Sequence, residues 1–300
     1  MMSEHAHRGL RSTLVGILVN FALAMVKGTA GFLGNSYALI ADAVESTIDI
    51  FSSAIVWSGL KISTRPPDAS HPYGYGKAEP IAGMVVSLAL IAAGIGIAVQ
   101  SVAEIVTPHH SPAPFTLAVL IVVVVVKETL FRFVFSVGES TQSTAVKGDA
   151  WHHRSDALTS AAAFVGILVS LIGGQGFESA DDWAALIAVP VILFNAYRIF
   201  IPAINEVMDS APPDNIHETI CEAARRVEGV VALEKCLVRK MGFSYYVDLH
   251  VTVDGSLSVR KGHDIGRTVR QAIRKQNTHV ADVLVHVEPS DLADERPGTV

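Results

Sequence analysis

The sequence predicts a polytopic α-helical membrane protein that ends in a small soluble domain. Half of its 300 residues are hydrophobic and only 17% are charged, and the mean hydropathy is positive. This composition is too apolar for an ordinary soluble protein. The long apolar runs are confined to residues 11–208, whereas acidic and basic residues mix freely in residues 209–300. We therefore predict an N-terminal tail (1–10), a membrane domain (11–208) and a soluble domain (209–300).

Six apolar runs in the membrane domain are long enough to cross a bilayer. About 20 helical residues span its hydrocarbon core. The first run continues to about Gly34, which is too long for a cleaved signal peptide. An even number of spans places both termini on the same side. The predicted spans lie at about 12–33, 37–60, 80–106, 115–136, 148–173 and 181–206.

The basic residues indicate which side that is. Lys and Arg occur in the N-terminal tail, in the loop 61–77 and in the connection after Arg132, whereas the connections at 109–114 and 174–182 contain neither. By the positive-inside rule, both termini are cytoplasmic. The second span then runs inward and the fifth outward, so these two helices are antiparallel.

Two eight-residue stretches, one in each of these spans, share a pattern. Residues 42–49 read Asp-Ala-Val-Glu-Ser-Thr-Ile-Asp, and residues 149–156 read Asp-Ala-Trp-His-His-Arg-Ser-Asp. In both, Asp-Ala is followed by a potential metal ligand and, four residues after that ligand, by another Asp. Residues three and four apart share one face of a helix. The two stripes are Asp42, Glu45 and Asp49, and Asp149, His152 and Asp156.

Each stripe needs a positively charged partner. An uncompensated carboxylate at the centre of a membrane helix costs roughly 3 kcal/mol. Because the helices are antiparallel, Glu45 and Asp49 can face His152 and Asp156, and together they offer four nitrogen and oxygen ligands. Zinc is the expected ion, with Cd, Fe, Mn, Co and Ni as further candidates. Protons that occupy the empty site would leave when metal binds, which is a chemical basis for antiport.

Other interpretations stay open for these residues. The acidic residues could be solvated caps at misplaced helix ends. An intramembrane metallohydrolase is disfavoured because four protein ligands leave no position for an activated water. His153 is displaced by 100° from His152, which favours a packing or supporting role. Lys127, Glu128 and Arg132 in the fourth span are expected to form ion pairs and to extend to the interface rather than to bind substrate.

Further motifs accompany the two stripes. They include Asn35-Ser36 before Ala41-Asp42-Ala43, the stretch His71-Pro72-Tyr73-Gly74, and the stretch Gly76-Lys77-Ala78-Glu79. With these residues the chain resembles, over essentially its whole length, the cation diffusion facilitators, which are six-span metal exporters with a cytoplasmic domain. The resemblance implies a homodimer in a lipid bilayer.

The resemblance also implies a tetrahedral transport site. Here that site would consist of Glu45, Asp49, His152 and Asp156. Many members have His or Asp where this chain has Glu45, so the longer side chain leaves metal selectivity open. Asp42 and Asp149 are interpreted as groups that flank the path of the ion.

The loop after the second span offers a further implied metal site. Asp68 and His71 match it, but Tyr75 replaces the next His of some members, and ordinary polar loop residues are the alternative interpretation. Lys77 and Asp209 match a charge pair that joins the spans to the cytoplasmic domain in relatives.

The soluble domain follows Pro212 and Pro213. Its order agrees with the small ferredoxin-like α/β domain of the family. The predicted elements are a helix at about 214–227, strands at 231–240 and 244–253, a helix at 259–276 and a strand at 280–287.

Strand periodicity predicts a polar face in this domain. Alternate apolar residues of 245–253 and of 283–287 share one face, so His250, His286 and Glu288 can converge on the other. In relatives this face binds regulatory metal, with His263 reaching across the dimer. Another family ligand position falls on Glu234. Solvated polar residues at a dimer surface are the alternative.

Composition excludes several other functions. Cys221 and Cys236 do not make a disulfide framework and fit a reducing compartment. The net charge of −6 without a basic block argues against nucleic acid. No organic cofactor is expected.

The sequence therefore predicts a secondary transporter, not an enzyme, in a prokaryotic cytoplasmic (inner) membrane. It would export a divalent transition metal, zinc in the first instance, in exchange for protons by alternating access, and cytoplasmic metal would regulate it. The alternative is a non-transporting membrane metal sensor or scaffold of the same fold.

Overall fold

The computed structural model describes residues 4–33, 37–106, 114–173, 177 and 179–290. A few side chains inside the helices, including those of Asp42 and Glu45, lie outside this description. The chain divides into two compact units, residues 1–204 and 205–300.

The first unit consists of six long helices, as the apolar runs predict. Each has 26 to 30 residues, enough to cross a bilayer core. The helices are α1 (Glu4–Leu33), α2 (Tyr37–Ser63), α3 (Ala78–Val106), α4 (Thr116–Thr141), α5 (Thr144–Gly173) and α6 (Ala180–Val207).

Length and hydropathy alone identify four membrane spans among the described residues, within α1, α3, α5 and α6. The other two long helices carry charged residues inside the span. These include Asp49 in α2, and Lys127, Glu128 and Arg132 in α4. Charge therefore enters the first unit on these two helices and also on α5, which contributes Asp149 and Asp156.

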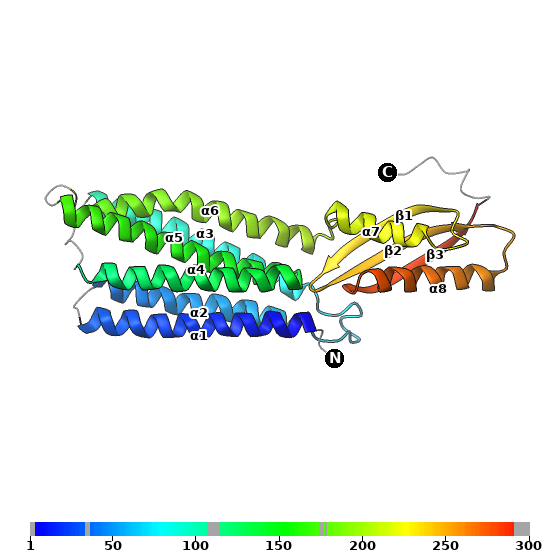
Figure 1. Cartoon of the computed structure of the whole chain (residues 1–300), viewed down its shortest axis with the longest axis horizontal. Coiled ribbons are helices and arrows are strands. Elements are labelled where there is room, and N and C mark those ends of the chain that lie inside the picture. The colour runs from blue at the N-terminus through cyan, green and yellow to red at the C-terminus, as the bar shows by residue number, and fades with distance from the viewer. Residues whose placement is uncertain (1–3, 34–36, 107–113, 174–176, 178, 291–300) are drawn as a thin grey trace. The chain divides into compact units, whose positions relative to one another are not determined.

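Consecutive helices of the first unit run in opposite directions (Figure 1), so α2 and α5 are antiparallel as predicted. Helix α2 packs against α1 and α3, and α5 packs against α4 and also contacts α2 and α3. The two stretches with the shared pattern therefore lie on neighbouring helices.

Two close contacts between segments that are distant in sequence stabilise this packing. Gly59 lets α2 approach α3 closely, because a Cβ atom at this position would lie only 2.4 Å from the Cβ of Ala82. The carboxylate of Glu79 is fully buried and accepts a hydrogen bond of 2.6 Å from the Ser143 hydroxyl. This bond joins the start of α3 to the connection between α4 and α5.

The second unit has the order of elements predicted from the sequence. Strands β1 and β2 pair antiparallel and β2 and β3 pair parallel, in the sheet order β1-β2-β3. Helix α8 begins at a cap in which Ser258 accepts a hydrogen bond from the Lys261 amide. The elements are α7 (Asp214–Arg225), β1 (Ala232–Met241), β2 (Ser244–Val253), α8 (Val259–Gln276) and β3 (Val280–Pro289).

The predicted alternation of β2 is confirmed. Its odd-numbered residues from Tyr245 to Val253 are all buried, and they pack with Ile220 of α7 and with Val269 and Ile273 of α8. The even-numbered residues are left for the opposite face. His250 is therefore displayed on that face without disturbing the core.

The cysteines differ from the expectation. Cys221 of α7 and Cys236 of β1 form a disulfide bond, and His217 lies beside them, with its Nε2 atom 2.9 Å from the Cys236 carbonyl oxygen. The number of cysteines gave no sign of this bond, because the packing of α7 on β1 brings the two sulfurs together. The expectation that these two cysteines fit a reducing compartment is therefore corrected.

We predict that Gly59→Ala lowers the melting temperature of the purified protein. The new methyl group collides with Ala82, and overpacking of this kind costs about 1–3 kcal/mol. Gly96→Ala in α3 is the matched control, because nothing described lies within 4 Å of a Cβ there. Thermal unfolding in detergent measures the difference. Equal melting temperatures for the two variants would show that the α2–α3 contact is looser than described.

Candidate metal centre

Three predicted ligands come together inside the first unit. Potential ligand atoms of Asp49 from α2 and of His152 and Asp156 from α5 all lie within 4.8 Å of one another. His152 Nε2 is 3.0 Å from Asp49 Oδ1, and His152 Nδ1 is 3.9 Å from Asp156 Oδ1. Asp49 is only 4% exposed, which does not fit a solvated helix cap. The two helices thus place one imidazole between two carboxylates.

The other members of the first stripe belong to the same helix as Asp49. Glu45 lies in α2 one helical turn before Asp49, and Asp42 lies nearly another turn earlier. Both side chains lie outside the described residues. Glu45 as the fourth ligand, and Asp42 as a group on the ion path, therefore stay predictions.

Lys127 of α4 also belongs to this cluster, although the sequence predicted that it would extend to the membrane interface. Its Nζ donates hydrogen bonds to Asp49 Oδ2 at 2.9 Å and to Asp156 Oδ2 at 2.7 Å, and the residue is fully buried. The expected ion pairing is thus found, but the expected extension to the interface is wrong. Lys127 lies near the middle of a 26-residue helix, too deep for its side chain to reach the surface. This central position in the helix was the sequence feature that could have predicted the burial of Lys127. Arg132 and Glu128 form the predicted ion pair at 2.8 Å.

A small cavity adjoins the cluster. Its volume is about 110 Å³, which is enough for water molecules. Asp49, His152 and Asp156 line it together with Ser52 and Ser155, and its walls come from α2, α3, α5 and α6. The carboxylates therefore face the cavity, while Lys127 reaches them from α4.

Asp149, the leading residue of the second stripe, is fully buried one turn from this cluster. Its Oδ1 accepts a hydrogen bond of 2.8 Å from the Ser53 hydroxyl of α2, and its Oδ2 is 3.9 Å from His153 Nε2. A Cβ atom at Gly16 of α1 would lie 3.1 Å from the same His153 nitrogen. His153 thus fills space between α1 and α5, consistent with a packing role. The place of Asp149 on an ion path stays a prediction.

The polar residues of the loop after α2 form hydrogen bonds with one another. Asp68 Oδ1 accepts hydrogen bonds from the Ser70 hydroxyl and from the amides of Ser70 and His71, and Asp68 Oδ2 accepts one of 2.6 Å from the Tyr75 hydroxyl. The Tyr75 bond, followed by the others, holds the pKa of the exposed Asp68 carboxyl well below its ordinary value. Tyr75 therefore occupies an oxygen of the carboxylate that a metal would need. A metal site at Asp68 and His71 stays a prediction.

The second unit contains the predicted cluster of polar residues. His250 Nδ1 is 2.8 Å and His286 Nε2 is 3.4 Å from the same oxygen of Glu288. These three residues form one of the candidate metal-binding groups among the described residues. A hydrogen bond with Glu234, together with the charge and hydrogen bond of His250, lowers the pKa of Glu288. Glu234 thus lies beside Glu288, and its role as a ligand, which the resemblance implies, stays a prediction.

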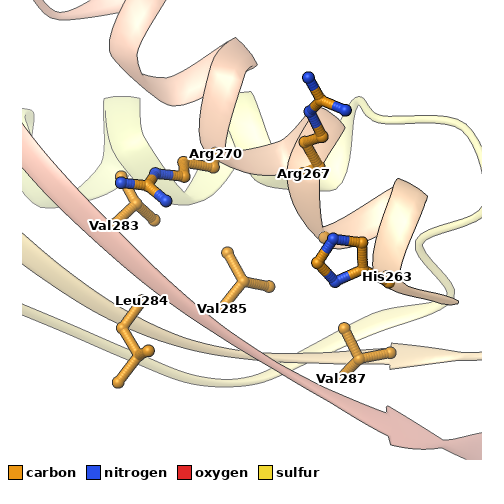
Figure 2. Close-up of a pocket in the computed structure, with 8 residues that line it drawn as sticks. His263, Arg267, Arg270, Val283, Leu284, Val285 and Val287 are labelled. Atoms are coloured by element: carbon orange, nitrogen blue, oxygen red, sulfur yellow. The ribbon is translucent and has the colours of Figure 1, made fainter. Parts of the chain in front are cut away.

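His263 lies apart from these three ligand atoms. It borders a groove of about 410 Å³ between α8 and β3, together with Arg267, Arg270 and Val287 (Figure 2). A second cavity, at the 254–259 turn, is lined by His263 and also by His286 and Glu288. His263 is therefore near the cluster but outside the group whose ligand atoms lie within 4.8 Å, as far as the described residues go. Its role across a dimer stays a prediction.

The residues of the predicted charge pair belong to different units. Lys77 precedes α3 in the first unit, and Asp209 follows α6 in the second. Asp209 has a left-handed backbone (φ 57°) just after the last turn of α6, and the Ser210 amide donates to the Asn205 carbonyl there. The pairing of Lys77 with Asp209 stays a prediction.

Comparison with known families identifies the class of protein. The cation efflux transmembrane domain matches residues 13–208, and the cytoplasmic domain of cation efflux proteins matches residues 212–290. The chain therefore belongs to the cation efflux, or cation diffusion facilitator, family. Members of this family are transporters rather than enzymes. The fold is accordingly a six-helix membrane domain followed by a ferredoxin-like cytoplasmic domain, as predicted.

Individual relatives match nearly the whole chain. The manganese efflux system protein MneP of Bacillus subtilis is 28% identical over 96% of this chain and 99% of its own length. Metal tolerance protein C1 of Arabidopsis thaliana is 32% identical over 93% of this chain and 62% of its own length. The magnetosome protein MamB of Magnetospira is 29% identical over 97% of this chain and its full length. This chain is accordingly an integral membrane exporter of divalent metal cations.

We predict that Tyr75→Phe raises the pKa of Asp68 toward its ordinary value of 3.8. The lost hydroxyl removes the largest contribution to the lowered pKa. The stabilising effect of the ionised carboxylate on this loop is present above the ordinary value and is lost as the pH falls through the lowered one. In the variant this stabilising effect is smaller, and its loss is complete at a higher pH. An NMR titration of isotope-labelled aspartate measures the change, with Tyr73→Phe as the control. An unchanged Asp68 pKa would contradict the described bond.

Proposed function

We propose that this protein exports a divalent transition-metal ion from the cytoplasm in exchange for protons, through a site formed by Asp49, His152, Asp156 and Glu45. The observation that supports this most is the convergence of two carboxylates and an imidazole from antiparallel helices beside a cavity in a membrane domain. Such ligands suit a borderline divalent ion, and protons can replace the ion when it leaves.

Zinc is the ion that the ligand set favours in this proposal, because tetrahedral nitrogen and oxygen ligands are typical of zinc sites. Manganese is a second candidate. The name of the related Bacillus protein supports it, and so does the third carboxylate that Glu45 would add, since oxygen-rich sites suit Mn(II).

The proposed mechanism is alternating access in a homodimer of a prokaryotic cytoplasmic membrane, with both termini cytoplasmic. The ligands are attached to two different helices, so a relative movement of α2 and α5 would change the coordination geometry and the side from which the ion is reached. The distribution of basic residues supports the orientation. The resemblance to the family supports the dimer.

In the cytoplasmic domain, we propose that His250, His286 and Glu288 bind regulatory metal. Their shared oxygen contact and their position on the face of the sheet opposite the core support this role. Metal there would draw two copies of the domain together, with Glu234 and His263 as additional ligands, and would favour one state of the membrane domain. A sensor without transport is the alternative, and a measurement of metal flux separates the two.

We predict that Asp49→Asn or Asp156→Asn reduces metal uptake into inverted membrane vesicles by roughly 100-fold. This corresponds to the loss of about 3 kcal/mol of ion binding when a charged ligand is removed. Zinc and manganese should be measured separately under an imposed proton gradient. Glu128→Gln is the matched control, because this carboxylate lies in α4 and pairs with Arg132 outside the site. Size-exclusion chromatography establishes that each variant remains folded. Full uptake by both aspartate variants would refute the transport site, and binding without flux in the wild type would favour the sensor.

We also predict that the double variant His250→Gln/His286→Gln abolishes the protection of β2 and β3 by zinc. Bound metal stabilises the folded domain by mass action, and both imidazole ligands are lost in the variant. Hydrogen exchange of the full-length protein, with and without zinc, measures this effect. His279→Gln, in a separate turn of the same domain, should keep the protection. Protection that persists in the double variant would show that these residues do not bind the metal.

A further inference from the structure

Lys127 has an unusual position for a lysine in a membrane helix. Its ammonium group lies 2.9 Å from one proposed metal ligand and 2.7 Å from another, and its side chain is 1% exposed. A metal ion bound by Asp49 and Asp156 would need oxygen atoms of these same two carboxylates. The lysine and the ion therefore share their partners.

Charge explains why the empty site needs such a group. Two carboxylates buried in a membrane domain repel each other and are costly without a cation. The ammonium of Lys127 halves the net negative charge of this pair and donates a hydrogen bond to each carboxylate. Without a bound metal ion, the two carboxylates of the site therefore still have a positively charged partner.

The same charge opposes the ion. The ion can approach from the cavity lined by Asp49, His152 and Asp156, whereas Lys127 contacts the carboxylates from α4. A divalent ion and an ammonium group on the same two carboxylates are within a few ångströms of each other, where their repulsion in a buried site is strong. Ion binding must then weaken or displace the contacts of Lys127.

We infer that Lys127 is a tethered counter-cation of the transport site, which stabilises the empty site and competes with the substrate ion for Asp49 and Asp156. This inference rests on the proposed function and concerns the position of a fixed charge, not the release of a proton. Its functional consequence is weaker binding and faster release of the ion. A transporter benefits from both, because a site that binds too tightly does not empty.

The competing explanation is that Lys127 only holds α2, α4 and α5 together. The two explanations predict opposite changes in metal affinity when Lys127 is removed. If Lys127 is only a structural clamp, its removal loosens the site and weakens metal binding. If Lys127 is a competing cation, its removal tightens metal binding and slows turnover.

The test measures Zn²⁺ and Mn²⁺ binding to the full-length protein in detergent by calorimetry. All variants carry His250→Gln/His286→Gln, so that metal binding by the cytoplasmic cluster does not contribute. We expect Lys127→Met to lower the dissociation constant at least about tenfold, and Lys127→Gln, which can still donate a hydrogen bond, to act in the same direction. In vesicles, both variants should show a lower KM together with a lower kcat.

Two controls separate charge from structure. Lys127→Arg keeps the positive charge, so it should not tighten metal binding as Lys127→Met does. Arg132→Met removes a positive charge from the same helix outside the site and should stay within about threefold of the wild type. Unchanged or weaker binding by a folded Lys127→Met or Lys127→Gln protein would overturn the inference.

A further variant distinguishes this failure from a failure of the proposed function. Asp156→Asn should abolish the binding that calorimetry detects in the same background. If it does so while the Lys127 variants bind no more tightly, only the role of Lys127 is wrong. If Asp156→Asn binds metal normally, the transport site itself is wrong.

Discussion

Carboxylates inside a membrane domain have to be paired with positive charge, and the contact of Lys127 with Asp49 and Asp156 meets this requirement. The three residues come from α4, α2 and α5, so one ion-pair cluster joins three helices. Breaking such a cluster by removing one partner would leave an uncompensated charge, which is among the most destabilising changes in a protein interior. The arrangement of these helices and the chemistry of the site therefore depend on the same contacts.

The surrounding contacts keep the ligands in place without adding charge. Gly59 allows α2 to lie close to α3, and Ser53 of α2 donates to the buried carboxylate of Asp149 in α5. The hydrogen bond between Ser143 and Glu79 fixes the connection that precedes α5. Since each ligand belongs to a rigid helix, its position relative to the others is set by helix packing. A shift between helices is then sufficient to alter the site.

The sheet of the cytoplasmic domain keeps the hydrophobic core and the proposed metal ligands on opposite faces. One face of β2 and β3 builds the core, so the other face can display His250, His286 and Glu288 at no cost in buried apolar area. The hydrogen bond with Glu234, together with His250, lowers the pKa of Glu288. Its carboxylate therefore stays ionised to lower pH than an ordinary glutamate, and this is the form that a metal ion needs.

The sequence by itself determined the six helices, the division into two domains, the strand faces and the identity of three residues that meet in the membrane domain. These features follow from local patterns, because helix and strand periodicity and long apolar runs are properties of neighbouring residues. Only the tertiary structure decided that Lys127 points into the site, that Tyr75 binds Asp68 and that Cys221 meets Cys236. Each of these contacts joins residues whose spacing carries no signal, since the distance between them depends on how whole helices, loops and strands pack. The sequence therefore specified which ligands could bind an ion. The packing of α4 against α5, which brings Lys127 to Asp49 and Asp156, decided which cation accompanies them.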